Sequence, residues 1–191
     1  MKIFNGVKQF NKAFTLIELI IVIAIIAILS VIAFPYYQPA RKQLALQRSA
    51  NKLAQDIRRA QGMALGAEAE GVGGEVPEGG YGIYLRSTVQ ESYVLFADID
   101  DDQKCNGCDS ESGEFIERIS FESGVEIQNL DNPFVNIIFK PPDPEVYLTN
   151  NGNQDLGSQT SIVICLIDDE SETKTIKVNK AGLIFVEYRS Y

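Results

Sequence analysis

One long apolar stretch, residues 14–34, constrains this chain more than any other feature. It contains only three polar residues, Thr15, Glu18 and Ser30, and neither proline nor glycine interrupts it. A helix of ~20 apolar residues crosses the ~30 Å hydrocarbon core of a bilayer. The stretch therefore predicts a membrane-spanning helix over residues 14–34.

Glu18 is the residue that a simple membrane anchor does not explain. On insertion scales an acidic side chain costs on the order of 2.5–3.5 kcal/mol at mid-membrane, and less near an end of the span. The apolar stretch holds no Lys or Arg that could pair with Glu18. Its partner must come from a chain terminus, from another subunit or from the lipid headgroups.

The residues around Glu18 form a recognisable motif. Residues 12–18 read Lys-Ala-Phe-Thr-Leu-Ile-Glu and lead into the Ile/Val/Ala-rich run. They resemble the class III signal of type IV prepilins and type II secretion pseudopilins. The resemblance implies that a prepilin peptidase cuts between Ala13 and Phe14 and methylates the new Phe14 amine. It also implies that Glu18 pairs with the N-terminal amine of a neighbouring subunit during assembly.

Ala13 departs from the family pattern, in which glycine precedes the cut. Alanine is the smallest substitute, so cleavage is still expected. The alternative is an ordinary secretory signal or signal anchor, whose apolar region is ~7–15 residues long and ends at a small-x-small site. The present run is longer, its one tolerable site is residues 31–33, and Pro35 follows closely. That alternative also leaves Glu18 without a role.

The charges before the apolar stretch predict its orientation. Residues 1–13 carry Lys2, Lys8 and Lys12 and no acidic residue, and positive flanks stay cytoplasmic. We therefore expect a cytoplasmic leader at residues 1–13, followed by a single pass through the cytoplasmic (inner) membrane. The globular part faces outward, and the processed chain is expected in a filament.

The overall charge limits the partners and the chemistry. The chain has 17 Lys and Arg against 26 Asp and Glu, a formal net charge of −9. Such a surface repels phosphate backbones, so nucleic acid is disfavoured as a partner. The chain has no His, and His is the commonest general base at neutral pH. We therefore expect no enzymatic activity.

Helical periodicity continues beyond the apolar stretch. Pro35 and Pro39 should bend the helix because each lacks an amide proton, and Gly62 and Gly66 mark its end. We assign residues 35–66 as an amphipathic continuation of the first helix. Its apolar face, which we expect to pack on a sheet, recurs at spacings of three and four residues: Leu46, Ala50, Leu53, Ile57, Ala60 and Ala64.

Residues 67–191 are predicted to form a β-rich extracytoplasmic domain. Gly- and Glu-rich residues 67–80 cannot bury a face and are predicted to be a loop. The whole pattern predicts an α+β, pilin-like fold, with a long N-terminal helix packed on an antiparallel β-sheet domain. The strand candidates are 81–86, 93–98, 114–121, 125–128, 135–139, 161–167, 173–179 and 183–188, with a polar hairpin connection at 168–172.

Short segments of this domain resemble the GspH/FimT family of minor pseudopilins and minor pilins. Examples are Tyr-Gly-Ile-Tyr-Leu at 81–85 and Asn-Ile-Ile-Phe-Lys-Pro at 136–141. The usual Gly-Arg near the C-terminal strand is Gly182-Leu183 here. The resemblance implies a minor pseudopilin of a type II secretion system that assembles with other pseudopilins. A minor pilin of a type IV pilus and a non-polymerising, membrane-anchored binding domain are the alternatives.

The loop at residues 98–114 is the densest in metal-ligand side chains. Asp98, Asp100 and Asp102 alternate as the first carboxylates of an EF-hand loop do, but Gln103 stands where that loop needs glycine. The loop is therefore no EF-hand. Related major pseudopilins bind calcium, so a looser calcium site is the one cofactor to consider, while a solvated acidic loop is the favoured interpretation.

The cysteines favour a disulfide over a metal site. Cys105 and Cys108 form a Cys-x-x-Cys pair, and Cys165 is the only other cysteine. A closed zinc site needs four thiolates, or two thiolates with two His. In an oxidising exterior a Cys105–Cys108 disulfide is expected. Cys165 is expected to be buried within a strand, and a disulfide from Cys165 to one of the pair is the open alternative.

Overall fold

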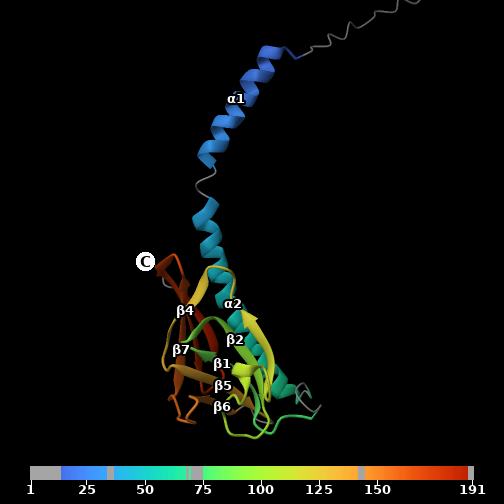
Figure 1. The fold of residues 1–191 in the computed structure, drawn as a ribbon, viewed down its shortest axis with the longest axis vertical. Coiled ribbons are helices and arrows are strands. Elements are labelled where there is room, and N and C mark those ends of the chain that lie inside the picture. Colours follow the sequence, from blue (N-terminus) through green and yellow to red (C-terminus); the bar gives the residue numbers. More distant parts are fainter. Residues whose placement is uncertain (1–13, 34–36, 68, 70–74, 142–144, 189–191) are drawn as a thin grey trace, which may run out of the picture. The chain divides into compact units, whose positions relative to one another are not determined.

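The computed structural model describes residues 14–33, 37–67, 69, 75–141 and 145–188 of the 191-residue chain. The chain divides into two compact units, with the division between Ala40 and Arg41. Figure 1 shows their helices and strands.

The first unit contains helix α1 (Leu16–Ala33). The Thr15 carbonyl accepts the first helical hydrogen bonds, from the backbone N–H groups of Glu18 and Leu19. The helix interior is rich in Ile and Leu, and its second polar residue, Ser30, is satisfied within the helix through the Ile26 carbonyl at 2.7 Å. Among the residues that the structure describes, no helix combines the length and the apolar character that crossing a membrane requires. The predicted span ends at Phe34, which lies outside the described residues.

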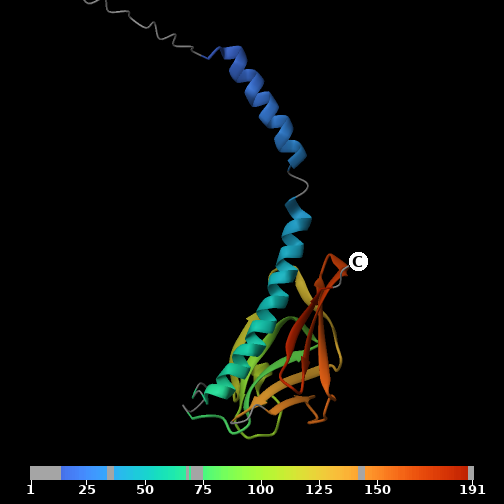
Figure 2. The ribbon, with the colours of Figure 1, turned by 180° about the vertical axis from the view of Figure 1, so that it is seen from behind.

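Helix α2 (Tyr37–Gly66) follows, and it lies along one side of the second unit from residue 41 onward (Figure 2). The helix ends at the predicted glycine. Pro35 lies outside the described residues, so its predicted bend is not tested, whereas Pro39 lies in the first turn of α2. All six residues of the predicted apolar face are buried, which confirms the periodicity: Leu46, Ala50, Leu53, Ile57, Ala60 and Ala64.

The second unit contains two antiparallel sheets rather than a single one. Sheet A has the strand order β3-β2-β1-β5-β6, and sheet B has the order β4-β7-β8-β9. The α+β class with an N-terminal helix and antiparallel strands is confirmed. The strands are β1 (Gly80–Arg86), β2 (Val89–Asp98), β3 (Phe115–Ser120), β4 (Val125–Leu130), β5 (Phe134–Lys140), β6 (Glu145–Thr149), β7 (Gln159–Leu166), β8 (Asp169–Asn179) and β9 (Ile184–Tyr188).

The main core lies between α2 and the inner faces of both sheets. Alternation along the strands places every second side chain on the same face, so Tyr81, Ile83 and Leu85 of β1 point into this core. Strand β7 contributes Ile162 and Ile164 from the other sheet. Burial of this apolar surface is what binds the helix to both sheets.

Polar side chains of α2 complete its attachment. Arg59 pairs with Glu117 of β3 at 2.8 Å. On the other side, Arg58 donates to the Ile184 carbonyl of β9 at 2.9 Å, and Gln61 donates to the Gly182 carbonyl at 3.4 Å. The helix therefore contacts an outer strand of each sheet through side-chain hydrogen bonds.

The outer face of sheet A carries a second, smaller apolar cluster. It consists of Tyr84, Val94, Phe96 and Ile138 together with Cys108, which comes from the long connection between β2 and β3. That connection contains a short 3₁₀ helix, Cys108–Ser110. The connection therefore covers part of a sheet face that α2 does not reach.

Candidate functional site

The residues of the methylation motif lie at the start of α1. Phe14 is 83% exposed and precedes the helix. Thr15 caps it, since its hydroxyl accepts the Glu18 N–H at 3.3 Å. Glu18 lies in the first turn, where the helix dipole favours an acidic side chain. Ala13, the predicted residue before the cut, lies outside the described residues.

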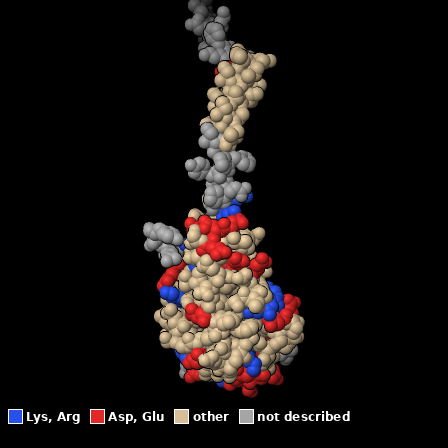
Figure 3. Space-filling model, turned by 60° about the vertical axis from the view of Figure 1, so that its left-hand side comes forward, with Lys and Arg blue, Asp and Glu red and all other residues tan. Residues whose placement is uncertain are grey.

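The surface of α1 is exposed and almost entirely uncharged, as Figure 3 shows for one side of it. Its side chains are exposed from Leu16 to Val31, with Leu16 at 76% and Val31 at 75%. No hydrogen bond or ion pair to the Glu18 carboxylate occurs among the described residues. An apolar surface this extensive needs lipid or protein to cover it.

The second candidate site is the acidic loop that follows β2. One carboxylate oxygen from each of Asp98, Asp100 and Asp102 lies within 4.8 Å of the others. Asp98 is fully buried, and its two oxygens accept the backbone N–H groups of Asp102 at 3.2 Å and Gln103 at 3.0 Å. The structure thus brings together the three residues that the sequence singled out.

Side chains of the loop itself already contact two of these three carboxylates. The side-chain amide of Asn106 donates to Asp100 at 3.2 Å and to Asp102 at 2.9 Å. Lys104 pairs with Asp102 at 2.6 Å. The oxygen ligands suit a hard cation in type and spacing, while the Asn106 amide donates hydrogen bonds to two of the carboxylates and Lys104 offsets the charge of Asp102.

Glu114 also contributes to this site, although the sequence analysis only placed it at the end of the loop and did not single it out. It is 4% exposed, and its two carboxylate oxygens accept the backbone N–H groups of Ile99 at 2.9 Å and Asn106 at 2.7 Å. Glu114 thereby joins the beginning and the middle of the loop to its end.

Burial changes the protonation of both buried acids. Burial raises the pKa of Asp98 to about 6, and the negative charges of Asp102 and Asp100 act in the same direction. Burial also raises the pKa of Glu114 to about 7, assisted by the charges of Asp98 and Asp100. Backbone N–H groups oppose both shifts. Asp98 and Glu114 therefore bind protons more tightly in the folded chain than in the unfolded chain.

We expect the free energy of unfolding to fall as the pH rises from about 4 to about 7. An acid whose folded pKa is raised stabilises the fold fully below its unfolded pKa, and this contribution is lost as the pH passes its folded pKa. The window follows from the ordinary values of 3.8 and 4.5 and the shifted values of about 6 and about 7. Urea unfolding at pH 5 and pH 7.5 measures the difference.

Glu114→Gln should reduce this pH dependence, because one titrating group is removed. Asp169→Asn is the matched control. The pKa of Asp169 is lowered by the Ser171 hydroxyl and backbone N–H, so its contribution changes only below about pH 4. Equal stability of the wild type at the two pH values would contradict the assignment.

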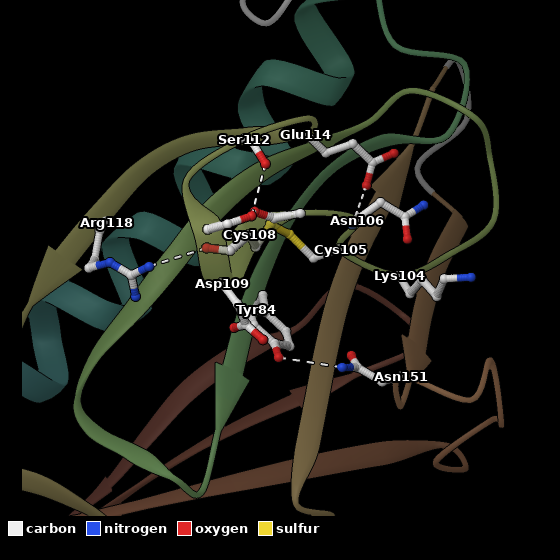
Figure 4. The surroundings of a disulfide bond; sticks show 12 residues. Tyr84, Lys104, Cys105, Asn106, Cys108, Asp109, Ser112, Glu114, Arg118 and Asn151 are labelled. Atoms are coloured by element: carbon white, nitrogen blue, oxygen red, sulfur yellow. Dashed lines mark hydrogen bonds between the residues drawn. A yellow bond between two sulfur atoms is a disulfide. The ribbon is translucent and has the colours of Figure 1, made fainter.

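The cysteines of the loop form one cross-link. Cys105 and Cys108 are joined by a disulfide, and Cys165 of β7 is a free, buried cysteine. Figure 4 shows the disulfide close to Tyr84, with Arg118 donating to the Cys108 carbonyl at 3.2 Å. The structure uses the pairing that the sequence favoured and not the Cys165 alternative.

Comparison with known proteins identifies one part of the chain. The family model described as the prokaryotic N-terminal methylation motif matches residues 8–34. Among curated proteins and among solved structures, none matches the chain at a significant level. The match supports the class III signal, and with it a membrane-anchored, pilin- or pseudopilin-like protein. The motif is consistent with processing by a prepilin peptidase and with assembly with other pilins.

Proposed function

We propose that the chain is a minor pseudopilin of a type II secretion system, a structural subunit of the pseudopilus or its tip. The observation that carries the proposal is the methylation motif at residues 8–34, placed ahead of a helix and an antiparallel β domain. The GspH/FimT-like segments of the β domain favour the minor class. A minor pilin of a type IV pilus is the alternative with the same support.

The mechanism follows from the uncovered apolar surface of α1. In the inner membrane, lipid covers this surface and the globular part lies outside. On assembly, the helices of neighbouring subunits replace the lipid. Because α1 is apolar on all sides, it can pack against several neighbours at once. The single polar contact of the bundle then decides the axial register.

That polar contact is between Glu18 and the methylated Phe14 amine of a neighbour. Thr15 and the first helical turn hold Glu18 close to the helix start, so both charged groups lie at the same end of α1. A carboxylate and an amine buried in a low-dielectric bundle are costly unless they pair. Only one axial offset between subunits pairs them, and this offset fixes the register.

The test is mass analysis of the N-terminal peptide of the protein extracted from its native membrane. A chain that begins at methylated Phe14 supports processing by the prepilin pathway. A chain that retains residues 1–13, or is cut near Ala33, would favour the non-polymerising anchor. Deletion of the gene separates the two alternatives. Loss of secreted proteins would indicate a pseudopilin, and loss of pili would indicate a minor pilin.

A second candidate function is calcium binding by the acidic loop, supported by the grouped oxygens of Asp98, Asp100 and Asp102. Calcium at 100 times its dissociation constant should raise the free energy of unfolding by about 2.7 kcal/mol. Asp100→Asn should abolish the gain, and Glu187→Gln on β9 should keep it. A melting temperature that calcium leaves unchanged would end this candidate.

A further inference from the structure

The two residues enclosed by the Cys105–Cys108 disulfide hold the loop together. The backbone N–H of Asn106 donates to the Glu114 carboxylate at 2.7 Å, and the Asn106 carbonyl accepts the Glu114 N–H at 3.1 Å. The Gly107 carbonyl accepts the N–H groups of Ser110 and Ser112, each at 3.1 Å. The disulfide therefore immobilises the point at which the loop's hydrogen bonds converge.

One half of this disulfide packs on sheet A. Cys108 is 1% exposed and packs with Tyr84, Val94, Phe96 and Ile138 on the outer face of the sheet. These four residues are themselves almost fully buried. Cys108 is the only fully buried member of this cluster that the loop supplies among the described residues. Moving the loop away would expose this apolar surface to water.

The remaining contacts of the loop's second half are polar and partly exposed. Arg86 pairs with Asp109 at 2.6 Å, and Arg118 pairs with Glu111 at 2.9 Å. In both pairs the acidic side chain is more than half exposed. Such ion pairs contribute little to stability. The restraints on this half of the loop are therefore the disulfide, the packing of Cys108 and the hydrogen bonds between Asn106 and Glu114.

This bond is open to exchange with thiols. Cys105 is partly exposed, whereas its partner Cys108 is buried. A disulfide limits the unfolded state less when its ring is short, and this ring has a sequence separation of only three. Exposed disulfides are the ones that exchange most readily.

We propose that Cys105–Cys108 is a thiol–disulfide exchange site for an external dithiol, and that its reduction releases residues 105–114 from their hydrogen-bonded conformation. One thiolate of the dithiol attacks the Cys105 sulfur, and Cys108 leaves as a thiolate and takes up a proton. The second thiol of the dithiol, as a thiolate, then attacks the sulfur that it holds in the mixed disulfide, and Cys105 leaves. Two electrons and two protons pass to the protein, and the dithiol becomes a disulfide.

Hydrogen–deuterium exchange of the full chain in detergent, with and without dithiothreitol, tests the release. We expect the amides of Asn106, Ser110, Ser112 and Glu114 to exchange about tenfold faster after reduction, because local opening exposes them. Peptides from α2 and sheet B should keep their rates. Unchanged loop rates, after a mass gain of about 2 Da has verified reduction, would overturn the proposal, as would an equal increase throughout the chain.

The rate of reduction tests the exchange site itself. Dithiothreitol should reduce the folded chain within about tenfold of the rate for the urea-unfolded chain, because attack needs only local access. Reduction more than about a thousandfold slower in the folded chain would overturn the site, because global unfolding would then be required. Both measurements should be unchanged in Cys165→Ala, which removes the one other thiol. The Cys105→Ser/Cys108→Ser variant, if it folds, should show the fast loop rates without dithiothreitol.

Discussion

Glu18→Ala is expected to reduce incorporation into filaments by about a hundredfold or more, while the amount of chain in the membrane stays the same. Removing one partner of a buried ion pair costs roughly 3–5 kcal/mol, because the other charge stays buried and unpaired. In lipid the substitution instead removes a costly carboxylate, so insertion should not suffer. The measurement is the ratio of chain in sheared filaments to chain in membranes.

Ser30→Ala provides the matched control for this prediction. Ser30 is the other polar residue of α1, and its hydroxyl is already satisfied by the Ile26 carbonyl. Its loss removes a polar group without leaving a charge unpaired, so incorporation should stay near the wild-type level. Equal incorporation of Glu18→Ala and the wild type would exclude the proposed role of Glu18 in setting the register.

Gly80→Ala is expected to destabilise the globular unit by roughly 2–5 kcal/mol, the sum of a left-handed backbone penalty and overpacking. Gly80 has a φ of +95° at the start of β1. An added Cβ would lie 2.1 Å from the Phe139 carbonyl oxygen of β5. A backbone atom of a paired strand cannot move without disturbing the sheet. Urea unfolding of the wild type and the variant measures the difference.

Gly124→Ala separates the two causes. Gly124 also has a positive φ, +88°, but an added Cβ would meet no atom within 4 Å. This variant should lose only about 1–2 kcal/mol. Similar losses in the two variants would show that the close approach to Phe139 has no energetic effect.

The strongly periodic elements could be predicted from the sequence. The apolar face of α2 and eight of the nine strands in the described part of the chain were predicted, because burial on one face leaves a regular pattern. Strand β6 was missed: its inward residues Val146 and Leu148 alternate, but the strand is short and follows a proline-rich segment. Strand β8 starts at Asp169, within the predicted polar connection. Its first residues are exposed and polar, so they leave no apolar alternation by which a strand could be recognised.

The division into two sheets and the contacts of the acidic loop could not be predicted. Pairing partners such as β1 and β5 are far apart in sequence, and hydrophobic patterns do not state which strand pairs with which. The role of Glu114 depends on Asn106 being brought opposite to it. That placement results from the conformation of the loop, which no sequence pattern specifies. The sequence therefore shows Glu114 only as an acidic residue between the loop and β3.

The hydrogen bonds from α2 to β9 reduce the exposure of backbone groups at one edge of sheet B. An outer strand with free carbonyls and N–H groups invites a strand from another chain, and this leads to aggregation. Arg58 donates to the Ile184 carbonyl at the start of β9, and Gln61 donates to the Gly182 carbonyl two residues before it. In the proposed filament, where the N-terminal helices would bring many copies together, these contacts would reduce pairing of β9 with a strand of another subunit.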